Sequence, residues 1–405
     1  MSGKRLIAVR DETCIDCGFC SQFVACSKMQ TGCIGCGACI KGCPQGAIRL
    51  QPLAEPKSKI HFTVDGEKYL TRGPVSVLEA LRELGRVADE SESKIGSIQP
   101  YCRTGGCWNC AVVIDGVLDR SCVTPLRDKM EIITAPEILQ QTEPKRTVTL
   151  MRPAPHYHPS VFTHGCNYHC DLCHNWNLTF SSSSSSRSAI HPKEAAAKLN
   201  LDPEQDFWIG ISGGEPTLNR RWLTELVKTL HNTVPESRIQ LDTNASLLTP
   251  DYIDELVSAG ITDISPDLKA LRLGTFIKAC GTRSEKIARQ YLETSWSAVR
   301  YLDKTYRKKV FMAVSLPCHP RIHSKAEIED IGRSIAGINP EMPVTLIEYQ
   351  PAFHLRDWPF LSPKIMEQAQ KILESTGLHK VIIQGGSEIP RAIDPEELAM
   401  CSEEF

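Results

Sequence analysis

The sequence predicts an α/β protein in which two small cysteine-rich modules precede a partial (β/α)6 barrel. From Ser160 onward, six short apolar runs alternate with segments of helical period, as parallel strands alternate with covering helices. Before that point, the cysteines fall into two groups separated by a change of composition. The length of 405 residues allows two or three domains. We expect a first module at 1–55, a second at 56–140, a linker at 141–158, the barrel at 159–390 and a C-terminal tail at 391–405.

Composition and charge narrow the class of protein. The formal net charge is −2, which argues against nucleic acid or an anionic membrane as the main ligand. No stretch is apolar over the length needed to cross a bilayer, and Met1–Arg10 has no apolar signal core behind it. We therefore expect a cytoplasmic protein. Because the cytosol keeps thiols reduced, the 18 cysteines indicate metal or cluster ligation rather than disulfides.

The first cysteine group repeats one rhythm twice. Its two halves are Cys14, Cys17, Cys20 and Cys26, then Cys33, Cys36, Cys39 and Cys43. The second half has the C-x2-C-x2-C-x3-C-P spacing of bacterial ferredoxins, in which the fourth cysteine ligates the other cluster. A pair of zinc sites is the alternative, but zinc usually takes paired C-x2-C units rather than triplets.

This spacing predicts two [4Fe–4S] clusters with interleaved ligands. The fourth cysteine of each half crosses to the other cluster. One set is Cys14, Cys17, Cys20 and Cys43, and the other is Cys33, Cys36, Cys39 and Cys26.

The second module combines strand signals with a second cysteine group. Ile60–Val64 and Lys68–Thr71 flank the turn Asp65-Gly66, a hairpin signal, and Val75–Leu84 has a helical period. Further strands are expected at Ala111–Ile114 and Met130–Ile133. The cysteines are Cys102, Cys107, Cys110 and Cys122. Their x4, x2 spacing with a distant fourth member is typical of a plant-type [2Fe–2S] site, with a zinc loop as the alternative. The module resembles the β-grasp ferredoxins.

The barrel is predicted from the alternation of its strands and helices. The expected strands are Ser160–Thr163, Phe207–Ser212, Ile239–Asp242, Asp263–Leu268, Val310–Leu316 and Val344–Tyr349. The expected helices between and after them are Trp222–Leu230, Pro250–Ala259, Ser284–Leu302, Lys325–Ala336 and Pro363–Thr376. Six such units fall short of the eight in a closed barrel.

The third cysteine group lies directly after the first expected barrel strand. Cys166, Cys170 and Cys173 have x3, x2 spacing, and no fourth cysteine lies near them in the sequence. Three thiolates on a four-iron cluster leave one iron open, as in a catalytic rather than a structural site. Loops after barrel strands face the catalytic mouth. The motif resembles that of the radical S-adenosylmethionine (radical SAM) superfamily, and the expected fold is a partial (β/α)6 radical SAM barrel.

Downstream segments extend this resemblance. Gly213, Gly214 and Glu215 follow the second strand and are similar to the GGE motif that holds the methionine amino group of SAM in that family. Leu241–Asn244 and Asp267–Lys269 resemble segments of pyruvate formate-lyase activating enzyme, which activates a glycyl-radical protein.

The resemblance to pyruvate formate-lyase activating enzyme implies roles for individual residues. Asp242 would bind a monovalent cation, and Asp267 and Lys269 would contact SAM. His354 resembles a late barrel histidine that reaches SAM, with an ordinary surface histidine as the alternative. The related branch includes the MEMO-associated radical SAM proteins. Those enzymes usually lack N-terminal ferredoxin modules, so the resemblance leaves the substrate open.

The resemblance implies an enzyme that reductively cleaves SAM to a 5′-deoxyadenosyl radical, for protein radical activation or modification. The expected cofactors are three [4Fe–4S] clusters, one of them binding SAM, one [2Fe–2S] cluster, SAM itself and a monovalent cation. The expected partners are a low-potential donor, ferredoxin or flavodoxin, and a protein or small-molecule substrate, with neither nucleic acid nor membrane. The alternatives are a radical SAM methyltransferase acting on a peptide and an iron–sulfur electron-transfer subunit.

Three cysteines lie outside these motifs: Cys280, Cys318 and Cys401. Buried or incidental thiols are the favoured interpretation of all three. Cys318 beside His319, at the end of a barrel strand, is the exception, as a hydrogen-atom donor or an extra metal ligand.

Overall fold

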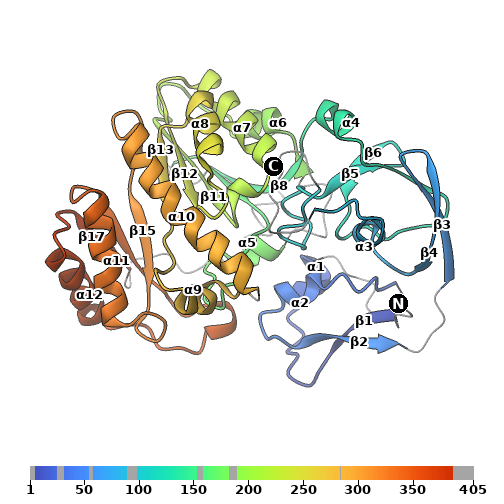
Figure 1. Ribbon diagram of the computed structural model, residues 1–405, viewed down its shortest axis with the longest axis horizontal. Helices are drawn as coiled ribbons and strands as arrows, with labels where there is room; N and C mark the ends of the chain where they lie inside the picture. Colours follow the sequence, from blue (N-terminus) through green and yellow to red (C-terminus); the bar gives the residue numbers. More distant parts are fainter. Residues whose placement is uncertain are drawn as a thin grey trace. The chain divides into compact units, whose positions relative to one another are not determined.

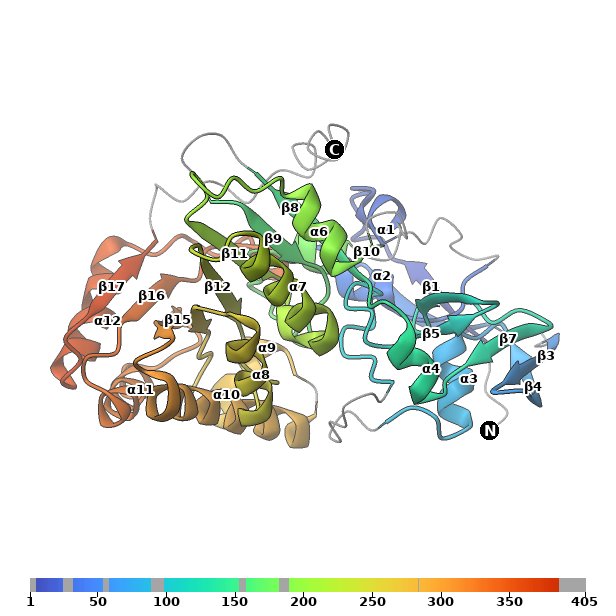
Figure 2. The ribbon, with the colours of Figure 1, turned by 90° about the horizontal axis from the view of Figure 1, so that it is seen from above.

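The fold comes from a computed structural model that describes residues 5–24, 32–53, 58–88, 98–152, 158–181, 189–282 and 284–385. The chain divides into two compact units. Unit 1 takes in the residues up to Asn167 together with Leu178–Leu201 and Gly213–Thr229. Unit 2 takes in Tyr168–Asn177, Asp202–Ser212 and the residues from Leu230 onward. Figures 1 and 2 show the elements coloured along the chain.

Unit 1 begins with a small module closed by one strand pair. Strand β1 (Arg5–Arg10) runs antiparallel to β2 (Ile48–Leu53). Between them lie the short helices α1 (Phe19–Gln22) and α2 (Ala38–Gly42). Gly18 and Gly37 precede these helices with φ of 75° and 74°, a conformation that glycine adopts without steric cost. Each glycine therefore lets the chain turn between two cysteines of a predicted cluster loop.

A five-stranded sheet with the order β4-β3-β7-β5-β6 forms the second part of unit 1. Its strands are β3 (Ser58–Val64), β4 (Glu67–Gly73), β5 (Ala111–Ile114), β6 (Val117–Arg120) and β7 (Met130–Ile133). Helix α3 (Val77–Glu83) begins at Ser76, whose side chain accepts a hydrogen bond from the backbone N–H of Glu79. Helix α4 is Pro136–Gln141. Asp65 and Gly66 both have positive φ in the turn between β3 and β4, which confirms the predicted hairpin.

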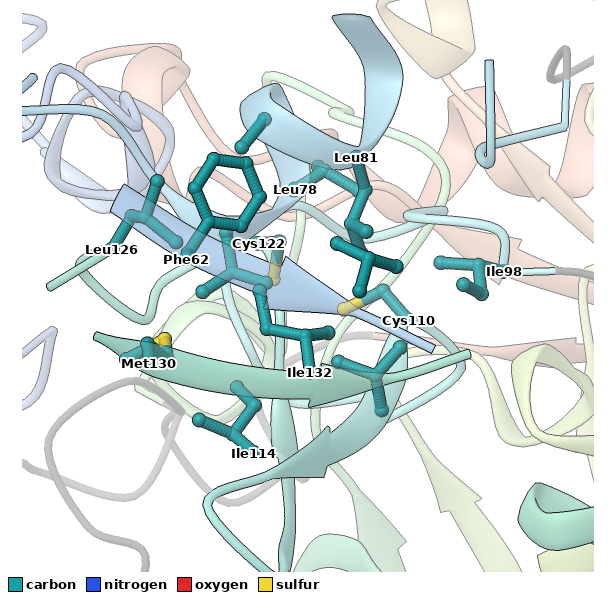
Figure 3. Packing of buried hydrophobic residues seen from close by; sticks show 14 of the residues in the cluster. Phe62, Leu78, Leu81, Ile98, Cys110, Ile114, Cys122, Leu126, Met130 and Ile132 are labelled. Atoms are coloured by element: carbon teal, nitrogen blue, oxygen red, sulfur yellow. The ribbon is translucent and has the colours of Figure 1, made fainter. Parts of the chain in front are cut away.

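The core of this sheet domain is one cluster of buried apolar side chains beneath α3. Phe62, Leu78, Leu81 and Ile132 belong to it. Figure 3 shows the sulfur atoms of Cys110 and Cys122 among these side chains. The apolar face of the sheet therefore also positions two of the predicted cluster ligands.

The segment predicted as a linker, 141–158, contains a strand. Strand β8 (Arg146–Met151) pairs antiparallel with β9 (Ser160–Thr163) and with β10 (Ala189–Ile190). The prolines around this segment concealed the signal, because they interrupt the pattern on both sides while Arg146–Met151 has the β-branched residues typical of a strand. The further elements of this stretch are α5 (Trp176–Phe180), α6 (Pro192–Lys198), η2 (Pro216–Leu218) and α7 (Arg220–Thr233).

Unit 2 consists largely of parallel strands connected by helices. Strands β11 (Trp208–Gly213), β12 (Arg238–Thr243), β13 (Asp263–Pro266) and β14 (Phe311–Met312) are neighbours in that order, all parallel. Strands β15 (Val314–Cys318), β16 (Val344–Glu348) and β17 (Val381–Gln384) form a second parallel set. A parallel bridge between Asp267 and Ser315 connects the two sets. Five of the six predicted strands are thereby confirmed. The strand predicted at Val310–Leu316 is instead two strands, β14 and β15, in different sets, and β17 adds a strand that the sequence did not predict.

Helices follow the strands of unit 2, including two, at Leu273–Cys280 and Phe353–Leu355, that the sequence did not predict. They are α8 (Pro250–Ala259), α9 (Leu273–Cys280), α10 (Glu285–Tyr306), α11 (Lys325–Ile338), η3 (Phe353–Leu355) and α12 (Pro363–Ser375). Helix α12 packs against β16, β17 and α11 (Figures 1 and 2). None of the helices in the described part of the chain is both long and apolar enough to span a membrane. The tail at 391–405, with Cys401, and the predicted ligand Cys26 lie outside the described residues.

Candidate functional site

Four cysteines of the first module surround one cavity. Cys14, Cys17 and Cys20 line it together with Cys43, which comes from the second repeat. Arg10 lines it as well, and its guanidinium donates to the Cys20 Sγ at 3.1 Å. The structure thus brings together the four residues that the spacing assigned to one cluster.

The second set in this module is more enclosed. Cys33 and Cys39 are buried, and Cys36 is half-buried. The Cys33 Sγ accepts backbone N–H groups from Ala8, at 3.3 Å, and from Gly35, at 3.4 Å. Hydrogen bonds to ligand sulfurs are one of the means by which proteins set cluster potentials.

The cysteines of the sheet domain converge in its interior. Cys102, Cys107, Cys110 and Cys122 are at most 3% exposed. The Cys107 thiol donates a hydrogen bond to Cys102, and the Cys122 thiol donates one to Cys110. Although burial alone would raise the pKa of Cys102, the hydrogen bonds from Cys107 and Thr104 hold it well below its usual range. Four convergent thiols of which some are poised as thiolates fit the predicted [2Fe–2S] cluster.

The three-cysteine motif begins at the end of β9. Cys166 belongs to unit 1, whereas Cys170 and Cys173 belong to unit 2. The thiol of Cys280 donates a hydrogen bond to Cys170, which with Lys269 lowers the pKa of Cys170. Cys280 is thus a buried thiol, within the favoured sequence interpretation, and it contacts Cys170 as well.

Helix α9 ends against the same motif. The Cys280 carbonyl accepts the backbone N–H of His169 at 2.8 Å. Gly281 has φ +62°, and a Cβ there would lie 2.1 Å from the His169 carbonyl oxygen. Only glycine permits this contact, so Cys280-Gly281 supports the loop that carries Cys170. The sequence signal for this role was the glycine that ends a helix directly after a cysteine.

Gly213, Gly214 and Glu215 pack on the segment that leads into Cys166. The Gly214 N–H donates to the Thr163 carbonyl at 2.6 Å, and the Glu215 N–H donates to the Gly165 carbonyl at 2.9 Å. A Cβ at Gly214 would lie 2.4 Å from the Gly165 carbonyl oxygen. The two glycines thus permit a close approach of two backbone segments. The buried Glu215 carboxylate accepts the Thr217 N–H and hydroxyl at 3.0 and 2.6 Å, which fixes the turn as expected.

Arg146 is a site residue that sequence reasoning missed. Its side chain is fully buried, and its guanidinium donates to the carbonyls of Glu215, Pro216 and His164. The Arg146 side chain therefore connects the backbone of the GGE segment to the backbone at the end of β9. Burial and the Arg146 charge lower the pKa of His164 to about 3, so this imidazole stays neutral. The available signal was an arginine within an otherwise apolar or β-branched strand.

Asp242 lies near the end of β12, and Asp267 and Lys269 follow β13, all at the carboxyl ends of parallel strands. The Nζ of the half-buried Lys269 lies 2.9 Å from the Asp267 carboxylate. Burial raises the pKa of Asp242 to about 6, with the Asp267 charge adding to the rise. A buried carboxyl beside a second carboxylate is a favourable place for a cation, because a positive charge relieves both.

His354 lies in the short helix η3 and contacts the cysteine loop. Its Nδ1 is 2.8 Å from the Asp171 carboxylate, and its N–H donates to the Asp171 carbonyl at 3.1 Å. The side-chain ligand atoms of His169, Asp171 and His354 lie within 4.8 Å of one another. His354 is thus held by the residue after Cys170 rather than by general surface contacts.

Two further side chains line the surroundings of Cys170 and Lys269. The Tyr349 hydroxyl is buried and has no hydrogen-bond partner among the described residues. Burial raises the pKa of Tyr349, and the Lys269 Nζ lies 5.8 Å from the centroid of its ring. His174 Nε2 accepts the Gln350 N–H at 2.9 Å, and burial lowers the pKa of His174, so the ring is neutral.

Cys318 ends β15 with a buried thiol. Burial raises its pKa to about 12, which keeps it protonated at neutral pH. A protonated thiol suits hydrogen-atom donation better than metal ligation. The His319 ring packs on Trp358 with centroids 4.5 Å apart.

Models of known protein families match three stretches of the chain. The model of the Radical SAM superfamily matches residues 160–317. A 2Fe-2S iron-sulfur cluster binding domain matches residues 57–137, and a 4Fe-4S binding domain matches residues 29–49. No curated protein gives a significant match.

Solved structures show distant likeness. SuiB from Streptococcus suis bound to S-adenosylmethionine is 13% identical, with a TM-score of 0.42, covering 55% of this chain and 48% of its own. A domain of pyruvate-formate lyase-activating enzyme from Bacteroides vulgatus is 19% identical, with a TM-score of 0.34, covering 43% and 96%. Coproporphyrinogen III oxidase from Escherichia coli is 14% identical, with a TM-score of 0.33, covering 42% and 41%. This chain therefore matches about half the length of the SuiB chain.

The family matches and the cysteine motifs agree in position. Cys166, Cys170 and Cys173 fall within the first match, and the four buried cysteines of the sheet domain fall within the second. The third match contains Cys33, Cys36, Cys39 and Cys43. The chain thus carries a radical SAM superfamily domain joined to ferredoxin-type 4Fe-4S and 2Fe-2S domains that precede it in the sequence.

Proposed function

We propose that this protein cleaves SAM reductively and uses the resulting radical to activate or modify a protein, with electrons delivered through its own N-terminal clusters. The observation that carries the proposal is the three-cysteine motif after β9, whose Cys170 lies beside the half-buried Lys269 and beside Tyr349, whose buried hydroxyl has no hydrogen-bond partner in the described part of the chain. When bound, the cluster and SAM would supply one-electron cleavage of a carbon–sulfur bond, giving methionine and a 5′-deoxyadenosyl radical.

The residues of the site fit SAM and a cluster with an open iron. Cys166, Cys170 and Cys173 would hold the cluster, and the Gly213–Glu215 turn would face the methionine amino group. Asp267 and Lys269 would contact SAM, and Asp242 would take a monovalent cation. His354 would reach SAM while Asp171 orients its ring. The buried Tyr349 hydroxyl, which has no hydrogen-bond partner within the described ranges, is the kind of polar atom that a bound ligand satisfies.

The N-terminal domains support a role in electron delivery. We propose that they hold two [4Fe–4S] clusters and one [2Fe–2S] cluster, which accept electrons from a cytoplasmic ferredoxin or flavodoxin. SAM cleavage needs a low-potential donor, and plant-type [2Fe–2S] sites lie near the low end of the biological range. The protein substrate is proposed from the likeness of Leu241–Asn244 and Asp267–Lys269 to segments of a glycyl-radical activating enzyme.

Iron content provides the first test. Three [4Fe–4S] clusters and one [2Fe–2S] cluster predict about 14 irons per chain in anaerobically reconstituted protein. The measurement is iron, sulfide and zinc analysis of the same sample. A preparation that holds only zinc, or fewer than about eight irons, would contradict the ligand assignment.

Anaerobic SAM cleavage tests the function itself. With dithionite, the wild type should form 5′-deoxyadenosine and methionine in equal amounts, which are quantified by chromatography. Cys36→Ala should slow the same reaction about tenfold when reduced ferredoxin is the donor, because a relay cluster is lost. Dithionite should restore that variant, since a small reductant does not require the relay. If both donors fail equally with Cys36→Ala, the N-terminal clusters serve structure or the chemistry itself.

A further inference from the structure

The two kinds of ferredoxin-type site differ in their access to solvent. Cys17 is exposed, and Ile15, which lines the same cavity, is 63% exposed. The four cysteines of the 2Fe-2S domain are at most 3% exposed. A protein donor can therefore approach the first site, whereas the second is enclosed by this chain.

Part of that enclosure comes from the residue that precedes the first radical SAM cysteine. A Cβ on Gly165 would lie 2.9 Å from both the Cys102 Cβ and the Cys107 N, and 3.1 Å from the Cys102 Sγ. Gly165 has φ +82°, so glycine is favoured there on two counts. The backbone that leads directly into Cys166 therefore touches two predicted ligands of the 2Fe-2S site.

Hydrogen bonds fix this contact. Asn219, which ends the η2 turn after the GGE motif, donates from Nδ2 to the Cys107 carbonyl at 3.1 Å. Thr147 of β8 donates its N–H to the Gly106 carbonyl at 3.3 Å, and its hydroxyl accepts the Trp108 Nε1–H at 3.0 Å. Three hydrogen bonds with two residues, Asn219 and Thr147, thus hold the loop of residues 102–110, which we call the relay loop.

A lysine of the first module also contacts the relay loop. The Lys41 Nζ donates to the Cys102 carbonyl at 2.9 Å. Lys41 lies between Cys39 and Cys43, one predicted ligand of each [4Fe–4S] cluster. The relay loop therefore contacts both the first module and the segment that leads into Cys166.

We propose that the iron held by the relay loop is the obligatory last carrier in electron delivery. It passes electrons from the first module to the cluster at Cys166. This order of electron carriers rests on the proposed function and adds the route that the electrons take through the chain. One electron from a reduced ferredoxin or flavodoxin would enter at the exposed Cys17 side. It would then reduce the iron held by the relay loop, and the iron held at Cys166 would gain the electron that the relay loop loses. Iron alone changes oxidation state, and no atom or proton is transferred.

A direct route from the first module is the competing possibility. A Cβ on Gly42 would lie 3.2 Å from the Phe180 Cβ, so the first module also touches the radical SAM half of unit 1 near Cys43. The two routes differ in whether electrons on the first module need the relay loop.

The experiment follows the electrons in a single turnover. Wild-type protein is reduced, excess reductant is removed, SAM is added, and the paramagnetic signals are recorded after rapid freezing. In the wild type, the [2Fe–2S] signal should disappear together with the appearance of 5′-deoxyadenosine. Lys41→Met should leave that decay unchanged but slow the loss of the first-module signals about tenfold, because their contact with the relay loop is gone. Lys68→Met, at an exposed position of β4, is the matched control.

Asn219→Asp should slow electron transfer from the relay loop to the cluster at Cys166. The aspartate keeps the oxygen that accepts the Trp222 N–H at the start of α7, but it loses the donation to Cys107. Both the [2Fe–2S] and the first-module signals should then persist about tenfold longer. Asn200→Asp, in an exposed turn, is its control, and Thr147→Val is the second variant if Asn219→Asp does not fold. If the first-module signals decay at the wild-type rate in both Lys41→Met and Asn219→Asp, the proposal is overturned in favour of the direct route.

A spectroscopic readout separates this inference from the proposed function. The [2Fe–2S] signal should relax faster when the cluster at Cys166 is reduced than when Cys170→Ala has removed it, because nearby paramagnets couple. This measurement does not depend on SAM cleavage. Equal relaxation in both proteins would refute the adjacency, whereas wild type that makes no 5′-deoxyadenosine with dithionite would refute the function.

Discussion

Replacing Cys170 by alanine should abolish 5′-deoxyadenosine formation with every reductant, while the spectra of the N-terminal clusters persist. The catalytic cluster has three protein thiolates, so the loss of one leaves too few to hold it, whereas the N-terminal sites have complete sets of their own. Cys170 also accepts a hydrogen bond from Cys280 and lies near the Lys269 charge. The measurements are product analysis and the paramagnetic spectra of the reduced variant.

Two comparisons make this prediction sharp. In the reduced wild type, adding SAM should change one [4Fe–4S] signal and leave the others as they were. Cys318→Ala, which removes a buried thiol from the end of β15, should retain SAM cleavage. If Cys170→Ala still forms 5′-deoxyadenosine, or SAM changes no cluster signal, the chain is better explained as an electron-transfer subunit.

Gly214→Ala should weaken SAM binding about tenfold or more and lower the iron content of the catalytic site. A methyl group there would lie 2.4 Å from the Gly165 carbonyl oxygen, closer than atoms can approach. Relief of that overlap costs about 1–3 kcal/mol and displaces the segment that enters Cys166. We therefore expect the cluster and SAM binding to be affected together, which SAM titration and iron analysis measure.

Gly337→Ala is the matched control for this substitution. Gly337 lies in α11, and a Cβ there would meet nothing within 4 Å. The control should bind SAM normally and stabilise the fold by about 0.4–1 kcal/mol, because alanine restricts the unfolded chain. Normal SAM affinity and full iron content in Gly214→Ala would show that the Gly165–Gly214 contact is dispensable.

The sequence by itself determined the features that depend on neighbours along the chain. The spacing of Cys166, Cys170 and Cys173 can be recognised without a structure, since one short loop presents all three thiolates. The Asp65-Gly66 hairpin and the alternating strands and helices of the barrel are local in the same sense, because dihedral preference and apolar period decide them. For the same reason, the strand at Arg146–Met151 was missed where prolines interrupt the local pattern.

Only the tertiary structure decided which distant residues support those motifs. Arg146 meets the Glu215 carbonyl across 69 positions of sequence, and Asn219 meets the Cys107 carbonyl across 112. Cys280 reaches Cys170 because α9 ends beside the cysteine loop. No local propensity encodes such pairs, since a buried arginine or amide is explained only by the carbonyl groups that the fold places opposite it. The order of the proposed electron route, which rests on Gly165 and Lys41, belongs to this class for the same physical reason.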